Sequence, residues 1–250
     1  MSNVSTEDLG PARIISWDNQ RHRNAWGRDT ISAIAEAIES SGDGEHRCLV
    51  VRGAGEDFSA GDDLFEAAAA TTESFGETIE QFQRLTLAVF ACPLPVIAAI
   101  DGVCIGGALE FAASCDLRIG THRSRYATPE VRIGLGASNA GTLLLPEVLG
   151  ESASRELLLT GQLKTAGWMN RHGFFNDVVD DLDAGIRDWI TVFDLTTRPA
   201  VHRTKRMLNE RFGDLLPQAM ERETQTCVDL FPTPEAREAV ERFASRRKQD

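Results

Sequence analysis

The chain has 250 residues, enough for one large domain or two small ones, and 42% of them are hydrophobic, as in ordinary folded proteins with a substantial core. Its formal net charge of −12 excludes nucleic acid as the expected partner, because binding a polyanion depends on clustered Lys and Arg. Five cysteines without a CxxC pair, no long apolar run and no signal-peptide pattern predict a cytoplasmic protein with neither a disulfide framework, nor a metal site, nor a membrane span.

Strands and helices alternate over the first 120 residues. Short apolar runs predict strands, and apolar residues at helical spacing predict helices. The expected strands are 12–17, 47–53, 95–102 and 116–120, and the expected helices are 26–42, 77–92 and 105–114. A loop rich in Gly, Asp and Ser, AGEDFSAGDDL, fills residues 54–64. This alternation predicts an α/β protein with largely parallel strand pairing.

The pattern changes after Gly150. The stretches that follow are mostly helical candidates, at 151–161, 164–173, 182–195, 199–212 and 234–248. The last hundred residues therefore predict a helical extension of the α/β part.

Two glycine-containing turns have the chemistry of an anion site. Gly106 and Gly107 stand where a helix is expected to begin, and the first N–H groups of a helix are unpaired and carry the positive end of its dipole. The turn FSAGDDL, residues 58–64, follows a buried strand and has similar small residues. One N–H from each turn, converging on one oxygen, would form an oxyanion hole. Tight packing of a helix on a strand is the alternative explanation.

Glu110 lies three residues after Gly107, so the two share a helix face. Its neighbours are apolar, and desolvation there is expected to raise the pKa of the carboxyl group. A second carboxylate, Glu130, follows a proline in YATPEVRIGLG. Two carboxyl groups beside one carbonyl, one accepting and one donating a proton, form an acid–base pair. A solvated helix face for Glu110 and an ordinary first helical turn for Glu130 remain the alternatives.

Together these segments resemble the enoyl-CoA hydratase/isomerase (crotonase) superfamily over roughly residues 12–248. The most specific segment is PVIAAIDGVCIGGALEFAASCDLRIG. The others are RNAW, CLVVRGAGEDFSAGDDL, YATPEVRIGLG, LLLTGQLKTA and EAREAVERFASRRK, which stand in the family's order.

The resemblance implies specific roles. The backbone N–H groups of Asp62 and Gly107 would hold the thioester oxygen, and Glu110 and Glu130 would be the two catalytic carboxylates of a hydratase. Coenzyme A and the acyl chain would bind along Ala60, Gly61, Asp62, Asp63, Leu64 and Gly106, with Arg23 and Lys248 near the phosphates. Coenzyme A is part of the substrate, so no separate cofactor or metal is expected.

The resemblance also implies the architecture. The expected fold is a crotonase fold, a spiral of ββα units over residues 1–195, followed by a helical region over 196–250 that covers the coenzyme A site and mediates trimerisation. Trimers of the family often pair into hexamers. The implied reaction is the addition of water across the 2,3 double bond of a 2-enoyl-CoA, as in fatty acid metabolism.

The chain departs from the family pattern at several places. The usual proline before RNA is absent in NQRHRNA, Asp62 replaces a small residue, and Leu143, Leu144 and Leu145 replace a polar and basic segment. Phe65, Phe75 and Phe82 border the expected acyl pocket or serve as core residues.

Other readings remain open on the same residues. One is a Δ3-Δ2-enoyl-CoA isomerase or another acyl-CoA hydrolase or lyase, since isomerisation needs only one well-placed carboxylate. Another is a non-catalytic homologue that binds acyl-CoA or RNA, although the net charge argues against RNA.

Overall fold

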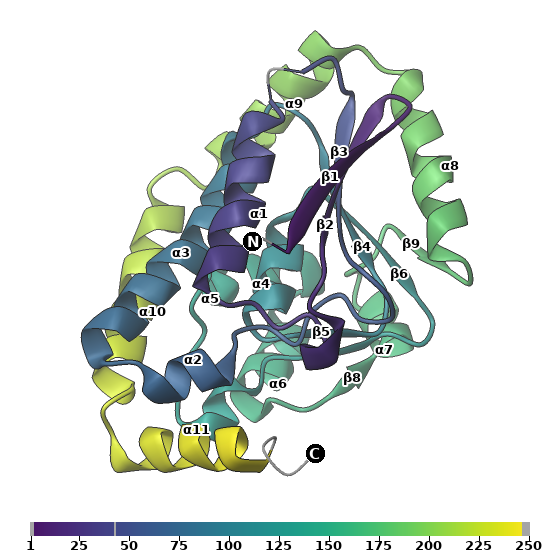
Figure 1. Ribbon diagram of the computed structural model, residues 1–250. Coiled ribbons are helices and arrows are strands. Elements are labelled where there is room, and N and C mark those ends of the chain that lie inside the picture. Colours follow the sequence, from purple (N-terminus) through teal and green to yellow (C-terminus); the bar gives the residue numbers. More distant parts are fainter. Residues whose placement is uncertain (1–2, 43, 247–250) are drawn as a thin grey trace.

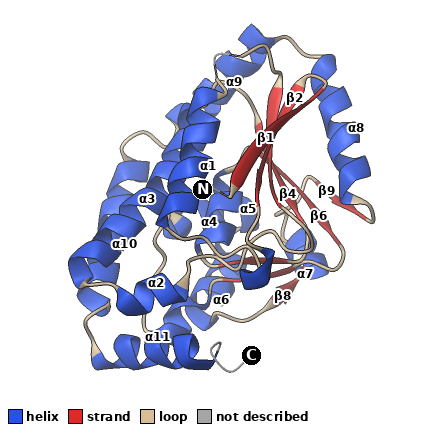
Figure 2. Ribbon diagram, viewed as in Figure 1, coloured by secondary structure: helices blue, strands red, loops and turns tan. Residues whose placement is uncertain are grey.

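The computed structural model describes residues 3–42 and 44–246. Its centre is a six-stranded sheet in the order β1-β2-β3-β4-β6-β9 (Figures 1 and 2). The edge pair β1–β2 is antiparallel and the remaining pairs are parallel. The strands are β1 Val4–Leu9, β2 Ala12–Trp17, β3 Cys48–Gly53, β4 Val96–Ile100, β6 Leu117–Thr121 and β9 Asp177–Val179.

The sheet is covered on both faces, as expected for parallel strands. Side chains alternate along β2, so that Ile15 and Trp17 enter one apolar cluster and Ala12 and Ile14 enter another. Helices α1 (Arg28–Ser40) and α3 (Thr72–Ala91) lie over the first face, and α8 (Leu182–Asp194) covers the second (Figure 1). The larger cluster lies on the α1 and α3 side, which is also the side of α4.

A second, three-stranded sheet in the order β5-β7-β8 lies near the ends of the long strands (Figure 2). Its strands are β5 Val103–Ile105, β7 Arg125–Ala127 and β8 Lys164–Thr165. The helices around it are α4 Gly107–Ser114, η2 Pro129–Ile133, α5 Gly141–Leu149, α6 Glu151–Thr160 and α7 Ala166–Arg171, and the turn η1 spans Gln20–His22. Because β5 leads directly into α4, this small sheet fixes the position of the glycine pair.

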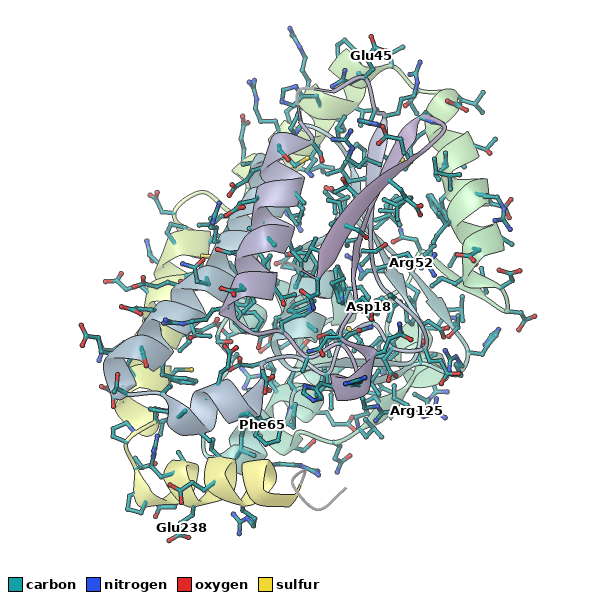
Figure 3. The ribbon with its side chains drawn as sticks, viewed as in Figure 1. Asp18, Glu45, Arg52, Phe65, Arg125 and Glu238 are labelled. Carbon is teal, nitrogen blue, oxygen red and sulfur yellow. The ribbon has the colours of Figure 1, made fainter. Side chains whose placement is uncertain are left out.

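The C-terminal part is helical, with α9 (Arg198–Glu210), α10 (Leu215–Leu230) and α11 (Pro234–Arg246). Helix α10 packs on α3, and α11 packs on η2 and the short helix α2 (Leu64–Ala69) of its own chain. The rings of Phe75 and Phe231 stack with centroids 4.0 Å apart and join α3 to the end of α10. Figure 3 shows Phe65 in the region of α2 and α11, and Glu238 on the outer side of α11.

The α/β alternation predicted from the sequence is confirmed, because each predicted strand and helix up to residue 120 is present. The mostly helical part predicted after Gly150 is confirmed by α6 to α11, and it also contains two short strands, β8 and β9. Those strands have two and three residues, too few to show a period of two. Strand β1 was missed because its side chains are mostly exposed and polar, as an edge strand allows.

No helix in residues 3–42 and 44–246 is both long and apolar enough to span a bilayer. All five cysteines are buried and unpaired. Over the same residues, no group of three or more His, Cys, Asp or Glu side chains is arranged to hold a metal ion.

Helix α9 is fastened to the sheet by a buried cation. Nζ of Lys205 donates to the carbonyl oxygen of Leu94 at 2.9 Å and to Oδ2 of Asp116 at 2.6 Å, and the same Oδ2 accepts the N–H of Val96 at 2.8 Å. The side chain of Lys205 is 6% exposed and that of Asp116 is 24% exposed.

We predict that Lys205→Ala lowers the free energy of unfolding by about 3 kcal/mol, because it leaves Asp116 without its counter-charge. Urea denaturation would measure this change. The control is Arg206→Ala, which removes an exposed pair with Glu210 and should cost about 0.5 kcal/mol or less. Equal losses in the two variants would contradict the prediction.

Candidate active site

Two loops that are far apart in sequence are bonded side by side. The N–H of Ser59 donates to the carbonyl of Val103 at 2.9 Å, and the N–H of Ile105 returns a bond to the carbonyl of Ser59 at 3.1 Å. On its other side, the same loop pairs with Trp26, whose N–H donates to Gly61 at 2.8 Å and whose carbonyl accepts from Asp63 at 2.9 Å. These bonds place FSAGDDL against the start of α4.

The bonding pattern leaves two amides free. Within the described residues, the N–H groups of Asp62 and Gly107 donate to no protein acceptor. The two loops touch, since a Cβ atom at Gly61 would lie 3.6 Å from the nitrogen of Gly107. Gly107 is the first residue of α4, so its N–H points out of the positive end of the helix.

Asp62 and Gly107 face one cavity, which we call the central pocket. Most of its other residues are apolar, and the polar ones are few. Its wall is formed by Ala60, Asp62, Leu64, Phe75, Thr78, Ile79, Phe82, Ile105, Gly106, Gly107, Pro129, Glu130, Ile133, Leu135, Gly136, Ser138 and Cys227. An apolar pocket with a few convergent polar groups is typical of a small-molecule site.

Gly106 allows a carboxyl group to approach the start of α4. Its φ is +60°, a conformation that L side chains rarely adopt, and a Cβ atom there would lie 2.6 Å from Oε1 of Glu130. The glycine pair predicted from the sequence therefore serves both the turn and the approach of an acid.

Glu110 is completely buried in the first turn of α4. Its Oε2 accepts the N–H groups of Ser138 at 3.2 Å and Asn139 at 2.6 Å, whereas Oε1 has no hydrogen-bond partner in the described chain. Burial raises the pKa of Glu110 well above its usual value, and the charges of Glu130 and Glu223 raise it further. Glu110 does not itself line the central pocket but lies behind the wall at Ser138.

Glu130 reaches the pocket from η2, where Pro129 occupies the first turn. Burial raises its pKa from 4.5 to about 7, to which the charges of Asp62 and Glu223 contribute. Asp62 has a pKa of about 7 as well, because of burial and the neighbouring charges of Asp63 and Glu66. These acids hold protons near neutral pH, which fits proton transfer.

A third glutamate, Glu223, was missed by the reasoning from sequence. It lies on α10, is 4% exposed, and its pKa is raised by burial. Its helix was not predicted, although Leu216, Met220 and Cys227 mark an apolar stripe that includes position 223. Glu110 was identified by its apolar neighbours in the sequence, whereas Glu223 has polar ones, so only apolar residues at helical spacing could have identified it.

The family model for enoyl-CoA hydratase/isomerase matches residues 13–250. The chain belongs to the enoyl-CoA hydratase/isomerase family.

The chain is similar to relatives that are named as hydratases and to others that are named as isomerases. The short-chain-enoyl-CoA hydratase of Clostridium acetobutylicum is 29% identical over 99% of this chain and 97% of that protein. A mouse mitochondrial Delta(3,5)-Delta(2,4)-dienoyl-CoA isomerase is 34% identical over 68% of this chain and 56% of that protein. The enoyl-CoA hydratase structure from Bacillus halodurans has a TM-score of 0.90 at 23% identity, covering 96% of this chain and all of that one. The crotonase fold predicted from the sequence is thereby confirmed.

The structure shows where several residues that depart from the family pattern, or border the expected acyl pocket, lie. Leu144 and Leu145 are buried in the main core and line no part of the central pocket. Phe75 and Phe82 do line the pocket while also packing in the core, and Phe65 does not line it. Each of these two phenylalanines therefore lines the central pocket and packs in the core, and their contact with an acyl group stays a prediction.

Two basic residues, Arg23 and Lys248, are expected near the phosphates of coenzyme A. Arg23 is exposed and its Nε donates to Asp57 at 3.0 Å, so it is paired at the surface. Lys248 lies outside the described residues. The roles of both remain predictions.

We predict that Glu130→Gln becomes more stable relative to the wild type as the pH rises from 5 to 8. A carboxyl whose folded pKa is raised from 4.5 to about 7 stabilises the fold fully below pH 4.5 and loses that contribution as the pH rises through 7. The full shift corresponds to about 3 kcal/mol, and residual solvent contact reduces it to about 2 kcal/mol.

Urea denaturation at each pH would measure this difference. The control is Glu151→Gln on the exposed start of α6, whose difference from the wild type should not widen over the same range. A constant difference for Glu130→Gln would contradict the buried setting of this carboxyl.

Proposed function

We propose that the protein adds water across the 2,3 double bond of a 2-enoyl-CoA thioester. The observation that carries this proposal is that two free amides and one carboxyl group face one apolar pocket, with a second carboxyl group behind its wall, and that these groups come from three separate segments. The amides belong to Asp62 and Gly107, and the carboxyls to Glu110 and Glu130. The family membership supports an acyl-CoA thioester as the substrate.

The two amides would bind the thioester oxygen. As water attacks C3, electrons move towards the carbonyl and negative charge builds on that oxygen. Fixed N–H donors aimed at it stabilise this charge, because they need no reorganisation in a pocket of low polarity. Loss of one such donor typically costs about 100-fold or more in rate.

The two glutamates would carry the protons. Glu110 takes a proton from the attacking water as the C3–O bond forms, and Glu130 gives a proton to C2. The pKa of Glu130, about 7, leaves a large protonated fraction at neutral pH. No metal or redox cofactor enters this scheme, since the reaction gains one water and exchanges no electrons with a cofactor.

Glu110 must be ionised to act as the base. Enclosure behind the wall at Ser138 favours its neutral form, whereas the two amide donors to Oε2 favour the carboxylate. Water that enters with the substrate would restore solvation at Oε1 and shift this balance towards ionisation.

Isomerisation of an enoyl-CoA is the second candidate. The mouse isomerase has the higher identity and the clostridial hydratase matches more of the chain, so similarity does not separate the two reactions. Two enclosed carboxyls favour hydration, because isomerisation needs only one acid–base group. A cytoplasmic trimer or hexamer stays a prediction from the resemblance.

We predict that Glu110→Gln and Glu130→Gln each lower hydration by at least about 100-fold, because each removes one proton-transfer step. Mass spectrometry of products from a panel of 2-enoyl-CoA and 3-enoyl-CoA esters would measure this. A gain of about 18 mass units marks the addition of water. A mass-neutral product, or binding without turnover across the panel, would reject hydration in favour of isomerisation or a binding protein.

We also predict that Gly141→Ala lowers hydration about 10-fold or more, because its Cβ atom would lie 2.7 Å from Oε1 of Glu110 and displace the carboxyl. The matched control is Gly167→Ala in α7, where the nearest atom would be 3.9 Å away. Steady-state kcat for both variants is the measurement. Equal kcat values would show that displacement of Glu110 does not limit the reaction.

A further inference from the structure

Glu223 enters the site region from the C-terminal helices. Its Oε1 accepts the backbone N–H of Thr142 at 2.8 Å and the hydroxyl of Thr142 at 2.5 Å. Its Oε2 has no hydrogen-bond partner in the described part of the chain. A buried carboxyl with one unpaired oxygen is costly, so its retention on the apolar side of α10 calls for a role.

Thr142 connects Glu223 to Glu110. It is the second residue of α5, and three residues earlier stands Asn139, whose N–H binds the Glu110 carboxyl. Between them, Ala140 has a φ of +59°, an uncommon conformation for a residue other than glycine. A backbone conformation of this kind persists only when the surrounding structure holds it. Here Asn139, before Ala140, is bonded to Glu110, and Thr142, after it, is bonded to Glu223.

Helix α3 clamps the same loop from the other side. Nε2 of Gln83 donates to the carbonyl of Ser138 at 3.1 Å and to Oγ1 of Thr224 at 2.8 Å. The hydroxyl of Thr86 donates to the side chain of Asn139 at 2.8 Å. Gln83 thereby links the loop to the residue next to Glu223.

We propose that Glu223 is a positioning residue for the reaction at Glu110, because through Thr142 it holds the loop whose amides bind the Glu110 carboxyl. This inference rests on the proposed hydration. Glu223 does not contact the substrate in this scheme. Its charge also acts on Glu110 through space and disfavours ionisation of that carboxyl.

The charged and titratable groups near Glu110 determine which substitutions can change the pKa of its carboxyl group. Helix α10 contributes Glu223 and Cys227, and η2 contributes Glu130, with Asp62 beside it. Helices α3 and α5 face the carboxyl region with the uncharged Gln83, Thr86 and Thr142.

Two variants separate the two effects of Glu223. Glu223→Gln keeps an oxygen that accepts from Thr142 but removes the charge, so the Glu110 carboxyl should titrate at lower pH, with kcat largely retained. Glu223→Ala removes the anchor, so kcat should fall about 10- to 100-fold with little change in KM. Thr142→Val keeps the backbone N–H but removes the hydroxyl, so its kcat should lie between those of the two Glu223 variants. The control is Glu221→Gln, an exposed residue on the same helix.

The titration is followed by carbon-13 NMR of the Glu110 carboxyl in the unliganded protein, with Glu110→Gln to assign the signal. This reading needs no turnover, so it decides the inference even if the wild type hydrates no ester and the proposed function fails. A change in the Glu110 titration in Thr142→Val, which leaves the charge of Glu223 in place, supports the inference when it is absent in Glu221→Gln. A shift confined to Glu223→Gln, with Thr142→Val matching Glu221→Gln in titration and kcat, reports only the loss of charge and overturns the inference. Thr142→Val suffices for this decision if Glu223→Ala does not fold.

Discussion

The site depends on holding the carboxyl group of Glu110 inside an apolar core. Burying an ionisable group without compensation is unfavourable, and here the compensation comes from two backbone N–H groups at Ser138 and Asn139. The neighbouring backbone makes room for it, since a side chain at Gly141 would collide with the carboxyl. The loop that donates these bonds is itself fixed by α3 and α10. The placement of one acid thus constrains four segments of the chain.

The architecture explains how such distant segments meet. The loop after β3 and the junction of β5 with α4 bond to each other, so one free amide of each faces the same pocket. The small sheet β5-β7-β8 then leads through β7 to η2, which brings Glu130 to the same place. Loops at the ends of parallel strands commonly carry function, because a rigid sheet positions them while their own sequence is free to vary.

Much of this could be predicted from the sequence, for identifiable physical reasons. Strands β2, β3, β4 and β6 are largely buried, so they appear as apolar runs, and Glu110 stands out as a charge among apolar neighbours. The donors to Glu110 could not be predicted, because Ser138 and Asn139 act through backbone groups that every residue has. Glu223 was missed because α10 is polar over much of its surface and carries a proline in its first turn. Strand β1 was missed because an exposed edge needs no apolar pattern.

The anchoring of the loop by α10 affects the order in which parts of the protein can fold during synthesis. Thr142 and Glu223 are separated by 81 residues, and Gln83 and Met220 by 137. During synthesis, a ribosome would release the strands, the free amides, Glu110 and Glu130 long before α10 emerges. The loop beside Glu110 can therefore reach its final geometry only after α10 has been made, and contacts of such long range form late and slowly. Chains that lack α10 would carry Glu110 without the bonds that anchor this loop.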